Sequence, residues 1–89
     1  MRTFKLKIST PDGSVFDGDA VKLDVRGIEG ELAVMAGHAP FMTAIKPGSC
    51  RLLLEDGDER FGELDGGLLS VGSEVTLLAA KFHWKNENE

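Results

Sequence analysis

Glycine and proline recur at short intervals along the whole chain, and this spacing limits the possible folds more than any other feature of the sequence. Eleven glycines and three prolines are distributed over 89 residues. Both residues interrupt helices, and the segments between them are mostly too short for a helix of roughly three turns. The stretch after Gly72 is long enough, but its first half has the pattern of a strand. The spacing therefore favours short strands joined by turns.

The segments between these breakers alternate apolar and polar residues with a period of two. This pattern is typical of strands that bury one face. The apolar positions expected to face the core are Phe4, Leu6, Ile8, Val21, Leu23, Val25, Leu32, Val34, Met42, Ala44, Cys50, Leu52, Leu54, Val75, Leu77 and Ala79.

Turn-forming residues lie between several of these segments. They are Pro11-Asp12-Gly13, Asp17-Gly18, Asp56-Gly57 and Gly66-Gly67. Many short strands at nearly regular spacing predict an all-β fold, a small two-sheet β-sandwich or flattened barrel. Two stacked sheets allow a small chain to bury both inner faces. We expect one sandwich domain over residues 1–84 and a polar tail over residues 85–89.

Composition excludes several classes of function. Ten basic and 15 acidic residues give a net charge of −5, and the basic residues do not cluster. The chain therefore lacks the cluster of basic residues that would bind nucleic acids or anionic membranes. A single cysteine, Cys50, allows neither an internal disulfide nor a multi-cysteine zinc site. The N-terminal residues do not resemble a signal peptide, and no apolar run approaches the ~20 residues of a membrane helix. We expect a soluble, cytoplasmic protein.

No motif in the chain predicts nucleotide or metal binding. There is no P-loop and no dinucleotide fingerprint. The acidic run from Asp56 to Asp65 fails the calcium-loop template, because Arg60, Phe61 and Gly67 stand where a ligand, the glycine and the bidentate glutamate belong. We interpret this run as a solvated hairpin tip and expect no metal and no cofactor.

The two histidines, His38 and His83, suggest two alternative functions. A hydrolase built on His38 would need a nucleophile motif, and the sequence has none. His83 lies between Phe82 and Trp84, and this terminal cluster is the basis for a second alternative, a small ligand-binding β-barrel. Packing over an edge of the sandwich is the simpler interpretation of the cluster. A domain of this size also has little room for a deep catalytic cavity, which favours binding at a surface.

The segment GIEGELAVMAGHAPFMTAIKPG, residues 27–48, resembles the signature of the epsilon subunit of F-type ATP synthases. The matching positions are Glu31, Leu32, Gly37, His38, Ala39, Pro40, Thr43, Ala44, Lys46, Pro47 and Gly48. Residues 10–18, 65–71 and 75–79 are similar to further family elements, so the resemblance runs in order over about residues 3 to 80. Ala36 and Ala33 depart from the family's usual proline and glycine.

This resemblance implies a β-sandwich of about ten short strands and a subunit that is not a catalyst. The family's N-terminal domain belongs to the rotating central stalk, where it binds the gamma subunit and rests on the c ring. It helps to couple ion flow to ATP synthesis, and it reaches the cytoplasmic face of the bacterial inner membrane only through the complex. The chain stops soon after the sandwich, so we expect a short form without the family's C-terminal helical hairpin.

The resemblance also implies a role for particular residues. Glu29, Gly30 and Glu31 match the loop that lies against the c ring. The residues that match segments associated with gamma are Ser9, Thr10, Pro11, Asp12 and His38. Met35 and Phe41 do not fit the inner-face alternation. Together with Met42 they are candidates for an exposed apolar patch that gamma covers, the alternative being ordinary core.

Overall fold

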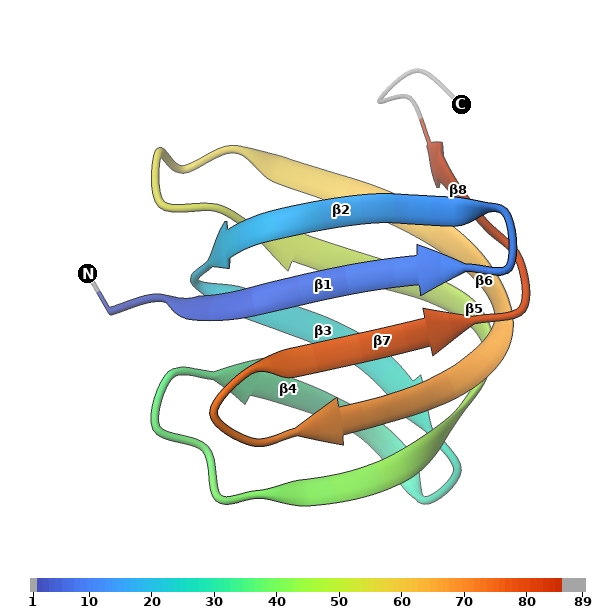
Figure 1. Cartoon of the computed structure of the whole chain (residues 1–89), viewed down its shortest axis with the longest axis horizontal. Coiled ribbons are helices and arrows are strands. Elements are labelled where there is room, and N and C mark those ends of the chain that lie inside the picture. The colour runs from blue at the N-terminus through green and yellow to red at the C-terminus, as the bar shows by residue number, and fades with distance from the viewer. Residues whose placement is uncertain (1, 86–89) are drawn as a thin grey trace.

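The computed structural model describes residues 2–85, which form strands and turns (Figure 1). The strands are β1 (Phe4–Thr10), β2 (Gly13–Ala20), β3 (Lys22–Gly27), β4 (Gly30–Met35), β5 (Phe41–Leu53), β6 (Glu59–Val71), β7 (Val75–Ala79) and β8 (Phe82–Lys85). The predicted all-β class is confirmed. Among the described residues, no helix is long and apolar enough to cross a membrane. Apart from Lys85, the predicted polar tail lies outside the described residues.

Residues 2–85 contain eight strands rather than about ten, because two of them are long. β5 and β6 each contain 13 residues and pair with each other along almost their whole length. Gly66-Gly67, expected to form a turn, lies inside β6, and Asp17-Gly18 lies inside β2. Gly66 has a φ of +95°, which glycine adopts readily, and a side chain on Gly67 would collide with the Leu78 carbonyl. These glycines therefore allow a continuous strand to bend rather than end.

The strands form one sheet that folds over on itself. Their order is β2-β1-β7-β6-β5-β3-β4, and β8 pairs separately with β6. β1 and β7 are parallel, and all other pairs are antiparallel. In Figure 1, β1, β2 and β7 lie in the near layer with β3 behind them, while β5 and β6 curve around one side. The bent hairpin formed by β5 and β6 thus joins the two layers.

The core lies between the two layers and consists of apolar side chains from seven strands or their ends. The buried residues are Leu6, Ile8, Ala20, Leu23, Val25, Val34, Ile45, Cys50, Leu52, Leu64, Leu69, Val71, Val75, Leu77 and Ala79. The alternation predicted these inner faces correctly on β1, β3 and β7. On β5 it predicted the wrong phase near Met42 and Ala44, which are exposed, while Ile45 is buried. In the N-terminal half of β5, the register of pairing with β6 places the odd-numbered residues inward.

The C-terminal strand β8 covers part of β6 through its aromatic side chains. Phe82 occupies the space that a side chain on Gly62 would need. The rings of Phe82 and Trp84 meet edge to face with centroids 4.8 Å apart, and both are half-buried against the core. Lys85 Nζ lies 3.3 Å from Glu63 Oε1, to which Ser49 Oγ also donates at 3.0 Å. The sandwich-edge interpretation of the aromatic cluster is the one that the packing supports.

Candidate interaction surfaces

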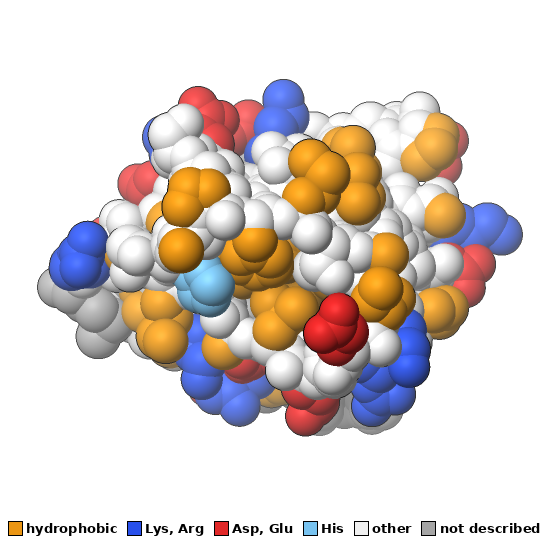
Figure 2. Space-filling view, turned by 90° about the horizontal axis from the view of Figure 1, so that it is seen from below, with side chains coloured by type: hydrophobic (Ala, Val, Ile, Leu, Met, Phe, Trp, Pro, Cys, Tyr) orange, Lys and Arg blue, Asp and Glu red, His pale blue; other side chains and the backbone are white. Residues whose placement is uncertain are grey.

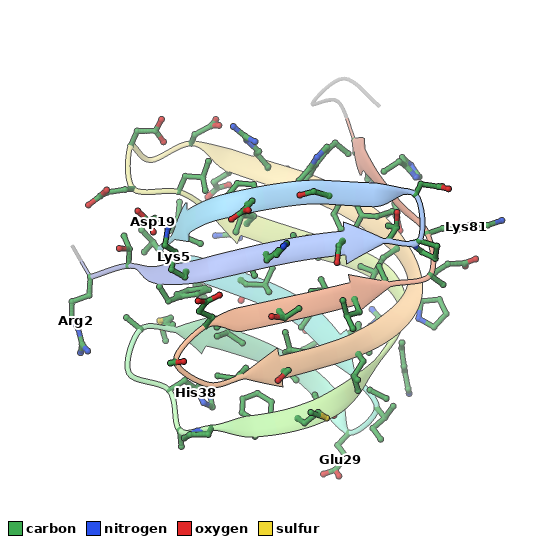
Figure 3. The ribbon with its side chains drawn as sticks, viewed as in Figure 1. Arg2, Lys5, Asp19, Glu29, His38 and Lys81 are labelled. Atoms are coloured by element: carbon green, nitrogen blue, oxygen red, sulfur yellow. The ribbon has the colours of Figure 1, made fainter. Side chains whose placement is uncertain are left out.

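The tip of the β3–β4 hairpin carries the residues expected to contact the c ring. Gly27 pairs with Gly30, so that Ile28 and Glu29 form the turn. Gly30 has a φ of +128°, a conformation that favours glycine. Glu29 and Glu31 are exposed, and Figure 3 shows Glu29 pointing away from the body of the sandwich. Neither carboxylate has an ion-pair partner within the described part of the chain. The tip therefore presents two unpaired negative charges to solvent.

The β4–β5 loop holds His38 in a defined conformation. The His38 backbone N–H donates to the Met35 carbonyl at 3.2 Å. In the side chain, Nδ1 donates to the Ala39 carbonyl oxygen at 3.0 Å, and the imidazole lies against the Phe41 ring with centroids 4.9 Å apart. Within residues 2–85, no hydrogen bond joins the His38 ring to a hydroxyl, thiol or carboxylate group, as a nucleophile–base pair would require. The hydrolase alternative has no geometric support.

The outward positions of β5, β6 and β7 form an exposed apolar surface, which we call the apolar face. It consists of Ile28, Met42, Ala44, Leu68 and Leu78. Across the sheet, Ala44 pairs with Leu68, and Leu68 pairs with Leu78. Ile28 joins this row because its backbone N–H donates to the Ala44 carbonyl at 3.2 Å. Met42 is 65% exposed, Ile28 54% and Leu78 50%.

Figure 2 shows hydrophobic side chains over the underside of the molecule, with an acidic side chain and a histidine among them and most other charged groups at the margins. Isolated apolar side chains are normal on protein surfaces, but a contiguous group marks an interaction site more often. Of the residues expected in such a patch, Met42 belongs to the apolar face. Phe41 is half-buried and packs against the core, and Met35, although 51% exposed, pairs with Lys22 on the β3–β4 hairpin.

Sequence reasoning missed Leu68, Leu78 and Ile28 as surface residues. The signal was present in the two leucine pairs Leu68-Leu69 and Leu77-Leu78. Successive side chains of a strand point to opposite faces, so a sheet with one buried face cannot bury both members of such a pair. Leu69 and Leu77 are fully buried, and their neighbours face outward.

The segment from Ser9 to Asp12 lies at the end of β1 and in the following turn. Thr10 Oγ1 accepts a hydrogen bond from the Asp12 backbone N–H at 3.1 Å. Ser9 pairs with Leu78 and so borders the apolar face. His38 lies near the start of β1, because it shares a surface depression with Phe4 and Lys5. The two segments expected to contact gamma thus lie at opposite ends of β1, and the apolar face extends between them.

The region around the terminal aromatic residues offers little to a ligand. An open depression of about 510 Å³ beside His83 is lined mainly by polar residues and by Phe82, while Trp84 is not part of it. Burial raises the pKa of the Cys50 thiol to about 11, so the thiol is uncharged at neutral pH. Within residues 2–85, no group of three or more His, Cys, Asp or Glu side chains could hold a metal ion.

Two solved structures are similar to this fold. One is a chain of the mitochondrial ATP synthase of Euglena gracilis, in a structure containing OSCP, F1 and the c ring; the TM-score is 0.87 at 21% identity. The other comes from the central stalk and c ring of the Tetrahymena thermophila mitochondrial ATP synthase, with a TM-score of 0.74 at 11% identity. Each match covers 92% of this chain, but only 53% and 66% of those chains. At these identities the likeness concerns the fold.

A family model gives the assignment. The model for the ATP synthase delta/epsilon chain, β-sandwich domain, matches residues 3–85 and therefore nearly the whole of the described chain. Its extent coincides with the strands from β1 to β8. The family resemblance expected from residues 27–48 is confirmed. The chain belongs to the β-sandwich family of ATP synthase delta/epsilon chains.

Proposed function

We propose that this chain is a non-catalytic central-stalk subunit of an F-type ATP synthase, linking the gamma subunit to the c ring. In this role it couples ion movement through the ring to ATP synthesis in the catalytic head. Family membership over residues 3–85 supports the proposal, as do the similar folds in two ATP synthase complexes. The observation that carries the proposal is the apolar face, which is exposed to solvent in the isolated domain.

The apolar face is the surface on which we place gamma. Burying the row formed by Ala44, Leu68 and Leu78 under a partner would remove apolar area from water, the main driving force for association. Ser9 extends the same row at one end, and the His38–Phe41 pair adjoins Met42 in the chain. Both segments expected to contact gamma therefore lie at the margins of this surface, where polar contacts fix orientation.

The acidic hairpin tip is the surface on which we place the c ring. Glu29 and Glu31 lack internal partners within the described chain and project from a turn held by β3 and β4. Basic residues in the loops of the ring would complement them, which fixes register more than it adds affinity. Ile28 belongs to the same turn and hydrogen-bonds to Ala44, so the proposed ring contact and the proposed gamma contact share a rigid connection.

The location of the chain follows from this assignment. As a stalk subunit it is associated with the membrane through its complex. We place it on the cytoplasmic face of a bacterial inner membrane, in keeping with the family resemblance of residues 27–48.

Binding to gamma from the same genome tests the proposal. We expect the unmodified chain to bind purified gamma in a one-to-one complex, measured by calorimetry and gel filtration. Met42→Glu and Leu78→Glu each place a carboxylate within the contact and should weaken binding roughly tenfold or more. Phe61→Glu is the matched control, because Phe61 is also exposed (40%) but lies on β6 opposite Arg51 and Lys85, away from the apolar face. Absence of binding by the folded, unmodified chain would refute the stalk assignment.

A further inference from the structure

A depression of about 350 Å³ lies at the end of the sandwich where β1 begins, and apart from Met35 and His38 its lining residues have no binding role in the function proposed above. The residues that give it its chemistry are Arg2, Lys5, Asp19, Gly37, His38 and Ser73, and we call it the notch. In Figure 3, Arg2, Lys5, Asp19 and His38 all lie at this end of the molecule, whereas Lys81 lies at the other. The notch is therefore built from β1, β2 and two loops that are distant in the sequence.

Arg2 is the most unusual group in the notch. Its Nη2 atom lies 3.2 Å from the point that a side-chain carbon on Gly37 would occupy, so the guanidinium rests on the bare backbone of that glycine. Gly37 has a φ of +83°, which also favours glycine. Within residues 2–85, Arg2 forms no ion pair. The Arg2 guanidinium, which carries several N–H donors, thus lies against the loop that contains Gly37, beside the cavity and without a counter-ion in the described part of the chain.

The rest of the notch also favours a negative ligand. Lys5 has one partner, Asp19, at 3.9 Å, and both side chains are more than half exposed, so this pair is weak. Hydroxyl groups of Thr3 and Ser73 and the imidazole of His38 complete the polar lining. Two cations therefore face one anion, in a chain whose net charge is −5. The notch therefore has a local excess of positive charge that the chain as a whole does not have.

We infer that the notch receives a carboxylate side chain of the gamma subunit, held by Arg2 and Lys5. This inference rests on the proposed function. The reason for choosing a partner's carboxylate is continuity: His38 lines the notch, its ring lies 4.9 Å from that of Phe41, and Phe41 directly precedes Met42 of the apolar face. A protein that covers that face and extends from Met42 to His38 would reach the notch. An Arg–carboxylate pair at the rim of an apolar contact is directional and would fix the rotation of the sandwich on its partner.

The experiment measures the affinity of the full chain for gamma of the same genome at several salt concentrations. Arg2→Gln and Lys5→Gln should each weaken binding roughly three- to tenfold, and the double variant should flatten the dependence of Kd on salt. Arg60→Gln is the control, because it removes one exposed positive charge near the start of β6, outside the notch. Circular dichroism and the melting temperature establish that each variant is folded.

A second arm tests the isolated chain with inorganic phosphate, followed by NMR. We expect no saturable binding in the millimolar range. Saturable, Arg2-dependent shifts confined to the notch would overturn the inference by assigning the site to a free anion. Unchanged gamma affinity in Arg2→Gln and Lys5→Gln, together with weak binding by Met42→Glu, would overturn the notch inference and leave the stalk assignment intact. If the unmodified chain does not bind gamma, both fail.

Discussion

The phenyl ring of Phe82 fills the space that a side chain on Gly62 would occupy, and this contact fastens the last strand to the sandwich. A methyl group at Gly62 would also lie 3.2 Å from Cys50 Sγ. The strand β8 is short and, within residues 2–85, pairs only with β6, so its side chains have to supply much of its attachment.

Gly62→Ala should therefore destabilise the fold by about 1–3 kcal/mol, because Phe82 has to leave its place or strain the sheet. Equilibrium unfolding in urea measures the change. Gly72→Ala is the control: Gly72 has no positive φ and only an ordinary contact at 3.8 Å, so its effect should be within about 0.5 kcal/mol. Equal effects of the two substitutions would contradict the role assigned to Phe82.

The neighbouring leucines of β6 should behave very differently. Leu69 is fully buried and Leu68 is 39% exposed on the apolar face. Leu69→Ala should reduce the free energy of unfolding by about 2–5 kcal/mol, as for other buried leucines, and Leu68→Ala by less than about 1 kcal/mol. For gamma binding we expect the reverse: among folded variants, Leu68→Ala should weaken binding more than Leu69→Ala. A large loss of stability from Leu68→Ala would mean that the residue belongs to the core.

Glu63 links the acid stability of the protein to β8. Hydrogen bonds from Ser49 and Lys85 lower the pKa of this carboxyl below its ordinary value. Because the folded state holds the ionised form more firmly than the unfolded chain does, Glu63 stabilises the fold at neutral pH. This contribution is lost as the pH falls below about 4.5 and through the lowered pKa of the folded state.

Glu63→Gln should consequently be less stable than the unmodified chain at pH 7, and the difference should shrink as the pH falls from about 4.5. Thermal unfolding between pH 3 and pH 7 measures it. The control is Glu55→Gln, since Glu55 is exposed and forms no ion pair among residues 2–85. A difference that stays constant with pH would exclude this ionisation as the cause.

The rate at which the Cys50 thiol is alkylated should show whether β8 is attached to the sandwich. Burial raises the pKa of its thiol to about 11, so at pH 8 only roughly one thiol in a thousand is ionised. Alkylation by iodoacetamide should be very slow in the folded protein. Phe82→Ala uncovers the neighbourhood of Gly62 and Cys50 and should accelerate labelling, detected by mass spectrometry. His83→Ala, at an exposed position of the same strand, should not. Rapid labelling of the unmodified protein would contradict the observed burial.

The acidic hairpin tip should matter for the ring and not for folding. Glu29→Lys and Glu31→Lys reverse exposed charges that have no ion-pair partner among residues 2–85, so each should change stability by less than about 0.5 kcal/mol. If the tip meets basic loops of the c ring, each should slow association of the gamma complex with the ring and change its salt dependence. Glu74→Lys, in the exposed turn before β7, controls for net charge. Association unaffected by the tip variants would refute this contact.

Local patterns predicted part of the fold and failed at identifiable places. Alternation identified the inner faces of β1, β3 and β7, because alternate residues along each of these strands are buried. It failed at Gly66-Gly67, where a glycine pair bends a strand instead of ending it, and at Met42 and Ala44, whose phase depends on pairing with β6. Turn-forming residues show which backbone conformations a segment can adopt. Pairing with neighbouring strands in the sheet decides which of these conformations is adopted.

The sequence by itself determined the all-β class and the family, because glycine spacing, period-two alternation and the residues of 27–48 are local properties of the chain. Only the tertiary structure decided which leucine of each pair faces outward, and that Ser9, Leu78, Leu68, Ala44 and Ile28 form one continuous row. It also brought Arg2 onto Gly37. The physical reason is that exposure and juxtaposition depend on how distant strands pack together, and no window of neighbouring residues contains that information.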